Sequence, residues 1–274
     1  MPSDLHMHTS FSDGRLTPEE LIAEAKKAGL HYIALTDHDT VDGISHLYES
    51  GLFPTKGIHI IPGIEFSAHH SLHEVHILGY GIDIFCTSLL DKLNEVTDAR
   101  WSRFSEIVEK LNGLGYAITE ADVLAIAGVS KSISRSHIGR VLVKKGYFDS
   151  VRSAFKELLS KGQPAYVPHY RLEVEEVLSL ILAAEGRAVL AHPKLVYDEE
   201  LVERICQMGI DGIEVFYPQH DEDDTAHYLE LAKKYGLLPA GGSDFHGFPI
   251  RYPTEIGVFT IPDEYAVPFY RAEN

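Results

Sequence analysis

Short apolar runs alternate along the chain with segments of helical periodicity. Runs at 32–35 and 188–191 have the length of buried strands, and amphipathic stretches at 174–184 and 199–208 have the spacing of helices packed on one face. Thr17 stands where a helix would begin, followed by a proline and, three residues later, by a glutamate that completes a capping box. The alternation predicts βα units in an α/β barrel of parallel strands.

This alternation stops between residues 89 and 171, where only helical segments follow one another. We therefore predict a barrel formed by 1–88 and 172–274, with 89–171 as a helical insertion over the C-terminal mouth that serves as a substrate cap. Between 131 and 161 there are eight Lys or Arg against two acids. This local excess of positive charge suggests substrate binding, with a solvated helix face as the alternative.

Composition narrows the possible partners and compartment. A formal net charge of -17 argues against binding of long duplex nucleic acid, although it leaves room for a small phosphorylated substrate. No apolar run approaches the roughly 18 residues of a membrane span, and the N-terminus lacks a basic, apolar leader, so we expect a cytoplasmic protein without a membrane partner. Cys86 and Cys206 indicate neither a disulfide framework nor a thiolate zinc site.

Histidines and carboxylates stand at the ends of several apolar runs. His6 and His8 are two residues apart, so in an extended strand their side chains project to the same face and can converge on one ion. The C-terminal ends of barrel strands meet at one mouth, which would bring such residues together. Because imidazole and carboxylate occur without thiolate, the pattern favours manganese, iron or zinc. Apolar runs also end in Glu65, His76, His192 and Glu214, and in the segment with Asp244 and His246.

Four motifs occur in a characteristic order along the chain, at 4–14, 36–39, 63–79 and 191–246. In this respect the chain resembles the PHP (polymerase and histidinol phosphatase) family of metal-dependent phosphoesterases. The resemblance implies a distorted seven-stranded barrel that holds two to three divalent ions, Mn, Fe or Zn. It implies hydrolysis by a metal-bound hydroxide, without a serine or cysteine nucleophile. The implied ligands are His6, His8, Glu65 and Asp244 for one ion, Glu65 as a bridge with His76 and His192 for a second, and Asp13, His38 and His246 for a third.

The insertion contains the best substrate-binding candidates. Ser134 can cap a helix whose free amide groups favour an anion, and Arg135 adds a planar fork suited to phosphate. The resemblance implies that an Arg and a His of this insertion contact substrate phosphate, which points to Arg135 and His137. The alternative is that Arg135 and His137 only form the start of a helix and do not contact substrate. Weaker candidates are Tyr166, His169 and Arg171.

For other polar residues near the motifs, the sequence predicts less specific roles. Asp37 and Asp39 could orient ligand imidazoles, or serve in a turn or cap. His69, His70 and His73 are expected in an exposed loop, with His73 as an alternative to His76. Surface or strand-edge positions are expected for His31, His46, His59, His220 and His227.

The second motif and the basic insertion resemble the branch with nucleoside 3′,5′-bisphosphate phosphatases and 5′→3′ exoribonucleases that act on short RNA. We therefore predict hydrolysis of a phosphate ester of a small phosphorylated nucleotide. The alternatives are a histidinol-phosphate phosphatase or another small-molecule phosphomonoesterase, and, in a different class, a noncatalytic metal-stabilised PHP domain. Loss of ligands would mark the last, and none is lost. No coiled-coil or repeat signal predicts an oligomer.

Overall fold

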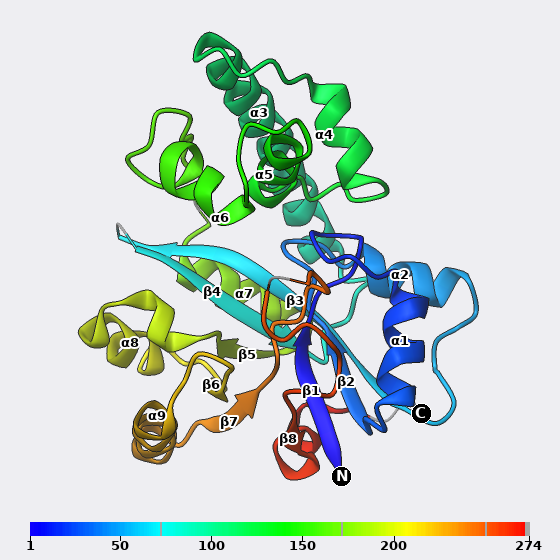
Figure 1. Cartoon of the computed structure of the whole chain (residues 1–274). Coiled ribbons are helices and arrows are strands. Elements are labelled where there is room, and N and C mark those ends of the chain that lie inside the picture. The colour runs from blue at the N-terminus through cyan, green and yellow to red at the C-terminus, as the bar shows by residue number, and fades with distance from the viewer. Residues whose placement is uncertain (72, 171, 250, 272–274) are drawn as a thin grey trace.

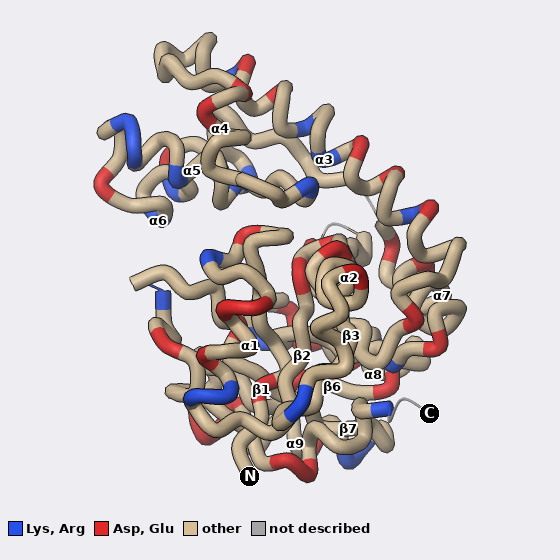
Figure 2. Tube along the Cα trace, turned by 90° about the vertical axis from the view of Figure 1, so that its right-hand side faces the viewer, with Lys and Arg blue, Asp and Glu red and all other residues tan. Residues whose placement is uncertain are grey.

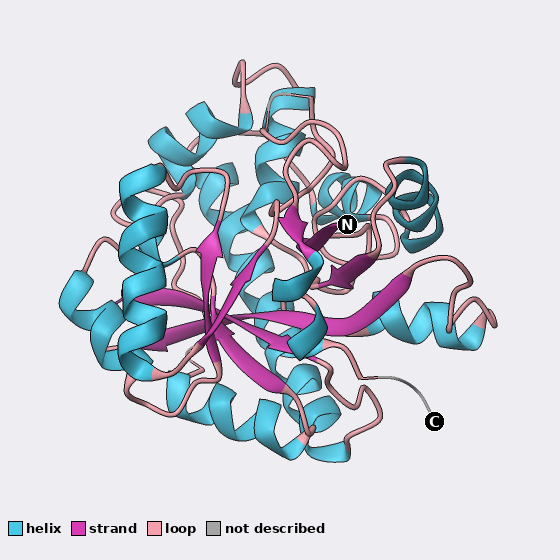
Figure 3. Ribbon diagram, turned by 90° about the horizontal axis from the view of Figure 1, so that it is seen from below, coloured by secondary structure: helices cyan, strands magenta, loops and turns pink. Residues whose placement is uncertain are grey.

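The computed structural model describes residues 1–71, 73–170, 172–249 and 251–271. One sheet, in the order β7-β6-β5-β4-β3-β2-β1-β8, curls into a nearly closed barrel surrounded by helices (Figure 3). The barrel closes where the segment after β7 returns beside β1, with the His8 amide donating to the Phe245 carbonyl at 2.9 Å. The strands are β1 (Pro2–Met7), β2 (Tyr32–Leu35), β3 (His59–His70), β4 (His73–Tyr80), β5 (Arg187–Leu190), β6 (Gly212–Phe216), β7 (Leu238–Gly241) and β8 (Ile261–Pro262).

The α/β barrel agrees with the prediction from sequence, but the prediction that all strands are parallel is wrong. Strand β4 runs antiparallel to both β3 and β5. Only two residues separate β3 from β4, too few for the crossover that a parallel pair requires. The two-residue β8 also pairs antiparallel with β1, which adds an eighth strand to the seven expected.

Helices cover the outside of the barrel, and side chains fill its interior. The first helix begins as predicted, since Thr17 accepts from the Glu20 amide in a capping box. Inside the barrel, Ile61, Leu78 and their neighbours form an apolar cluster below the mouth. The outer helices are α1 (Pro18–Lys27), α2 (Asp42–Glu49), α7 (Val174–Ala183), α8 (Glu199–Cys206) and α9 (Glu222–Tyr235), with shorter turns η2 (Pro193–Val196), η3 (Asp263–Tyr265) and η4 (Val267–Phe269).

The remaining helices lie together above the barrel mouth (Figure 1), and the view turned by 90° shows the same arrangement (Figure 2). They have an apolar cluster of their own, drawn from residues 104–167, and we call this group of helices the cap. The division of the chain at 89 and 171 stays a prediction. The cap helices are α3 (Thr87–Gly113), α4 (Glu120–Ala127), α5 (Arg135–Lys144), α6 (Val151–Ala154) and the π-helical turn η1 (Phe155–Leu159). None of the described helices is long and apolar enough to cross a bilayer.

Candidate metal centre

The structure brings all nine ligand candidates from the sequence together at the barrel mouth. Alternation along the strands explains part of this arrangement. On β3, Glu65 follows the interior residue Ile61 by four positions, and on β4, His76 stands two positions from the interior residue Leu78. His6 lies on β1, and the loops after β1, β2, β5 and β7 carry the others. We call the nine residues the cluster: His6, His8, Asp13, His38, Glu65, His76, His192, Asp244 and His246.

Glu65 lies at the centre of the cluster with its side chain only 1% exposed. Both carboxylate oxygens are surrounded by imidazole nitrogens, which suits a bridging role between two cations. Oε1 is 2.7 Å from His76 Nδ1 and 3.0 Å from His192 Nε2, while Oε2 is 2.9 Å from His38 Nδ1, 3.3 Å from His8 Nε2 and 3.4 Å from His6 Nε2.

The other two carboxylates of the cluster also lie beside imidazole nitrogens. Asp13 Oδ1 is 3.1 Å from His246 Nε2 and 3.9 Å from His38 Nε2. Asp244 Oδ1 is 3.2 Å from His8 Nε2. Ligand atoms therefore fall within 4.8 Å of one another in three groups: His8, Asp13, His38 and His246; His6, His8 and Asp244; and His38, Glu65 and His76.

These groups match the implied ligand sets only in part. His192 is in none of them, Glu65 is absent from the group with His6 and Asp244, and His38 joins Glu65 and His76.

Several buried atoms of the cluster have no hydrogen-bond partner within the described residues. Unsatisfied buried nitrogens and oxygens are costly, and their convergence on one place is what a set of cation ligands requires. Neutral imidazole and carboxylate are also ligands that first-row divalent metals accept. The residues thus fit bound metal ions. The atoms are His6 Nε2, His8 Nε2, Asp13 Oδ1, His38 Nδ1, Glu65 Oε2 and His246 Nε2.

The charges reinforce this fit. Burial opposes ionisation of Glu65, yet the His38 and His76 rings hold the pKa of its carboxyl well below its usual range. Burial by itself would lower the pKa of His76, but the Glu65 carboxylate raises it to about 10. The Glu65 carboxyl therefore stays ionised, as a cation ligand requires.

Glu214 on β6 belongs to this site although we assigned it no role from the sequence. Its side chain is fully buried, with Oε1 3.0 Å from His6 Nδ1 and Oε2 accepting from the His192 amide at 2.7 Å. A carboxylate on the outer nitrogen directs the inner nitrogen of the His6 ring toward the cluster. The sequence signal was an acid inside the apolar run at 212–216.

Two further groups missed from the sequence hold Asp244. Arg251 Nη2 donates to Asp244 Oδ2 at 2.7 Å, and the Tyr217 hydroxyl donates to the same oxygen at 3.0 Å. Because both act on Oδ2, Oδ1 stays directed at His8. Neither residue stands within a recognisable motif.

The two acids that flank His38 have roles other than orienting imidazoles. Asp37 accepts from the Thr9 amide at 2.7 Å, from the Thr9 hydroxyl at 2.6 Å and from the Ser12 hydroxyl, so it fixes the loop that leads to Asp13. Asp39 accepts from the Ser67 amide at 2.8 Å and pairs with Arg100 of the cap. Both sets of contacts join residues far apart in the sequence, so neither acid serves the local turn or helix cap that was the alternative.

A small cavity of about 150 Å³ separates the cluster from Arg135. The Arg135 guanidinium lies 5.5 Å from the Phe155 ring centroid and 5.8 Å from that of Tyr166, and its Nη2 donates to His169 Nε2 at 3.3 Å. Two of the weaker candidates therefore accompany Arg135. The third, Arg171, lies outside the described residues.

His137 has a structural contact in this arrangement. It is 1% exposed, and its Nδ1 accepts from the Ser134 amide at 3.0 Å within the capping box that starts α5. Burial lowers its pKa to about 4. The geometry favours the helix-start alternative, and a contact of His137 with substrate stays a prediction.

Among the described histidines of the β3–β4 hairpin, His69, His70 and His73 lie outside the groups of ligand atoms, whereas His76 belongs to one of them. His76 stands beside Glu65, whereas His73 is exposed and lies 3.5 Å from Asp198. His69 and His70 are half-buried, so their expected exposure is wrong; both lie on β3 of the hairpin, and His70 approaches Glu175 at 3.9 Å.

Five other histidines have partners outside the cluster: His31 with Asp263, His46 with Glu19, His59 with Tyr32, His220 with the Val215 carbonyl and His227 with Glu199.

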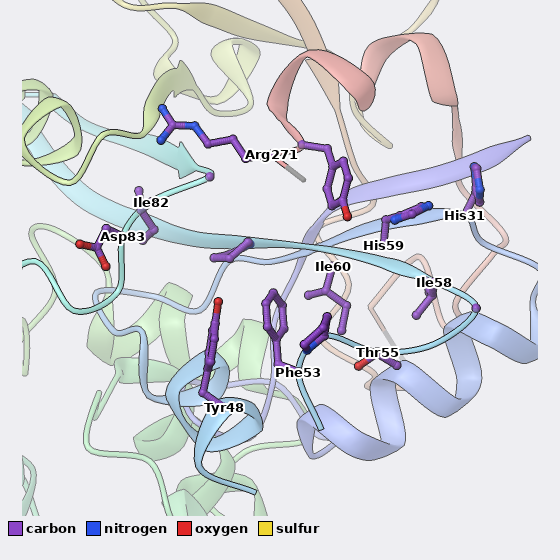
Figure 4. Close-up of a pocket in the computed structure, with 15 residues that line it drawn as sticks. His31, Tyr48, Phe53, Thr55, Ile58, His59, Ile60, Ile82, Asp83 and Arg271 are labelled. Atoms are coloured by element: carbon purple, nitrogen blue, oxygen red, sulfur yellow. The ribbon is translucent and has the colours of Figure 1, made fainter. Parts of the chain in front are cut away.

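A cavity of about 550 Å³ lies at the opposite end of the barrel, where β2 and β3 begin (Figure 4). Its walls include Tyr48, Phe53 and His59, with Asp83 and Arg271 at its edge. None of the cluster residues is among the described residues that line it. We therefore place the functional site at the mouth below the cap.

Comparison with known proteins shows the family of the chain. The sequence profile of the PHP domain matches residues 4–173. The chain belongs to the PHP domain family. A 3′,5′-nucleoside bisphosphate phosphatase of Chromobacterium violaceum is 34% identical over 249 residues, covering 89% of this chain and 86% of that protein. The 5′-3′ exoribonuclease Rnm of Escherichia coli is 34% identical over 250 residues, covering 89% and 84%.

Among solved structures, one from Bifidobacterium adolescentis described as a metal-dependent phosphoesterase superposes with a TM-score of 0.87. It is 29% identical, and the alignment covers 97% of this chain and 94% of that one. The likeness extends over both the barrel and the cap.

Proposed function

We propose that this PHP enzyme hydrolyses a phosphate ester of a small phosphorylated nucleotide, either a nucleoside 3′,5′-bisphosphate or the 5′ end of a short RNA. The observation that most supports this proposal is that the cationic Arg135 lies across a cavity of about 150 Å³ from the proposed metal-binding cluster. Two relatives at 34% identity are named for these two activities. The broader assignment of the chain as a metal-dependent phosphoesterase follows from its family and from the named relatives.

The cluster would hold two or three divalent ions, and we propose Mn, Fe or Zn. When bound, such ions lower the pKa of a coordinated water and neutralise charge on the reacting phosphate. Glu65 would bridge two ions, because both of its oxygens face ring nitrogens of other ligands. The ions would be held by the three groups of ligand atoms described above. His192, which lies beside Glu65 Oε1, would be a further ligand.

Residues outside the ligand set keep those ligands in place. Glu214 holds the His6 ring by Nδ1 and so leaves Nε2 as its free donor atom. Asp37 fixes the loop that positions Asp13, and Arg251 restrains one oxygen of Asp244. With these supports, the ligands are preorganised, which limits the reorganisation that binding would otherwise require.

A second phosphate would bind near Arg135. Arg103 lies close by, 6% exposed, with an Nη2 that has no hydrogen-bond partner within the described residues. Burial, followed by the charges of Arg135 and Arg100, lowers the pKa of Arg103 to about 9. Glu74, 3.7 Å from Arg135, offsets part of this positive charge. The positive charge that Glu74 leaves unbalanced would attract an added anion.

A parallel assay tests the proposal. The purified protein with Mn²⁺ is given adenosine 3′,5′-bisphosphate, a short 5′-phosphorylated RNA and histidinol phosphate at matched concentrations. We expect the highest kcat/KM with one of the two nucleotide substrates. A clear preference for histidinol phosphate would replace the proposal by the monophosphatase alternative. Absence of turnover with Mn²⁺, Fe²⁺ and Zn²⁺ would favour a noncatalytic domain instead.

A further inference from the structure

A second and larger cavity, of about 710 Å³, lies beside Asp244 of the cluster. Its walls come from α5 and α6 of the cap and from the segments that follow β6 and β7. Asp244 of the cluster lines this cavity, and Ser136 lines both this cavity and the smaller one beside Arg135. A molecule bound at the cluster can therefore extend into either cavity.

Aromatic rings and guanidinium groups dominate the walls of the larger cavity. Phe248 is half-buried, and the Arg140 guanidinium lies 5.0 Å from its ring centroid. Arg140 Nε is buried and has no hydrogen-bond partner within the described residues. The other aromatic and cationic residues of the walls are Tyr217, Tyr252, Arg152 and Arg251.

The charge in this cavity is opposite to that of the whole chain. Arg251 is offset by Asp244 at 2.7 Å. Neither Arg140 nor Arg152 has a carboxylate within 4.0 Å in the part of the chain that the structure describes. Asp244 is the single acid among the described lining residues. In a protein of formal net charge -17, such a recess favours a ligand that is both aromatic and anionic.

We propose that this cavity binds the base of a nucleotide whose phosphate ester lies at the cluster, with Phe248 as the stacking surface. The inference rests on the proposed function and specifies its substrate. Nucleobases stack on aromatic rings and on arginine planes, and this mode of binding tolerates different bases. The volume lies within the range of about 300–1,000 Å³ typical of small-molecule sites. An aliphatic phosphate would leave the recess unfilled.

The test compares two substrates that differ only in the base. Adenosine 3′,5′-bisphosphate and the matched 1-O-methyl ribose 3′,5′-bisphosphate are assayed with Mn²⁺ for the wild type and Phe248→Ala. The ratio of kcat/KM between the two substrates should fall about ten- to one-hundred-fold in the variant, because one stacking contact is lost. Phe248→Tyr should retain the ratio. Phe85→Ala, which removes a ring that is 64% exposed and outside the cavity, should also retain it.

An unchanged ratio in Phe248→Ala, or equal losses on both substrates, would overturn the base subsite while leaving the phosphoesterase in place. If the wild type hydrolyses neither substrate, the proposed function fails. The base subsite is then tested by measuring binding instead of turnover. Calorimetric titration with adenosine 5′-monophosphate should then show at least tenfold weaker binding to Phe248→Ala than to Phe85→Ala. Equal affinities for these two variants would overturn the inference as well.

Discussion

Arg100 of the cap and Asp39 of the barrel form an ion pair that is almost completely buried. Their side chains are 4% and 2% exposed, and Arg100 Nε donates to Asp39 Oδ2 at 3.1 Å. Arg100 also donates to the Ile133 carbonyl at 3.3 Å. Because Asp39 directly follows His38, this pair connects the cap to the loop that carries a ligand of the cluster.

Breaking the pair from one side should destabilise the protein. Arg100→Met would leave the Asp39 carboxylate buried without its partner, at a cost of about 3–5 kcal/mol. Equilibrium unfolding in urea measures the change. The double variant Arg100→Met/Asp39→Asn should recover part of the loss, since it removes the charge and Asn tolerates the φ of 50° at this position. A double variant less stable than the single one would contradict this account.

Glu65→Gln should reduce kcat by about three decades or more, because the neutral amide would bridge two cations poorly. His73→Ala is the matched control on the same hairpin, since His73 is exposed and stands away from Glu65. Steady-state kinetics with elemental analysis would report turnover and metal content together. Similar losses in both variants would mean that the ligand assignment is wrong, provided that circular dichroism shows both to be folded.

Removal of divalent ions should abolish hydrolysis and lower the Tm. A cation that binds only the folded cluster stabilises it, by about 2.7 kcal/mol at one hundred times its Kd. Exhaustive chelation followed by calorimetry, and then readdition of Mn²⁺, Fe²⁺ or Zn²⁺, tests the expectation. Full activity and an unchanged Tm after chelation would be incompatible with the proposed metal centre.

Arg135→Ala should change substrate preference more than it changes the chemistry. Loss of a charge-assisted contact to a second phosphate, worth roughly 1.5–3 kcal/mol, predicts about one to two decades in kcat/KM on adenosine 3′,5′-bisphosphate. With p-nitrophenyl phosphate the loss should be much smaller. Lys144→Ala removes an exposed charge from the same helix and serves as the control. Equal impairment on both substrates would place Arg135 at the reacting phosphate or in the fold.

Gly242→Ala should damage the site through the backbone of β1. A Cβ at Gly242 would lie 2.3 Å from the His6 amide nitrogen, a distance that forces one strand to move. We expect a loss of about 1–3 kcal/mol in unfolding free energy, together with weaker metal binding. Gly113→Ala meets nothing within 4 Å and should be neutral or slightly stabilising. Comparable stability of the two variants would argue against close packing beneath His6.

Local spacing along the chain predicted which side chains could reach the barrel mouth. His6 on β1 and His8 just after its end face the same side because side chains alternate along an extended chain, and Glu65 follows from the same rule on β3. The capping box at Thr17 was likewise readable, since it involves residues three positions apart. Such features depend on neighbours in sequence, so the sequence by itself determines them.

Other features depended on residues that meet only after folding. The His6–Glu214 contact joins positions 208 residues apart, and the Arg100–Asp39 pair joins positions 61 residues apart. No local periodicity encodes those pairings. The burial of His137 likewise depends on the packing of α5. The antiparallel direction of β4, by contrast, follows from its two-residue connection to β3, which is local in the sequence. The sequence thus determined which residues could bind metal and phosphate, while only the tertiary structure decided which partners orient them, because those partners come from distant strands and from the cap.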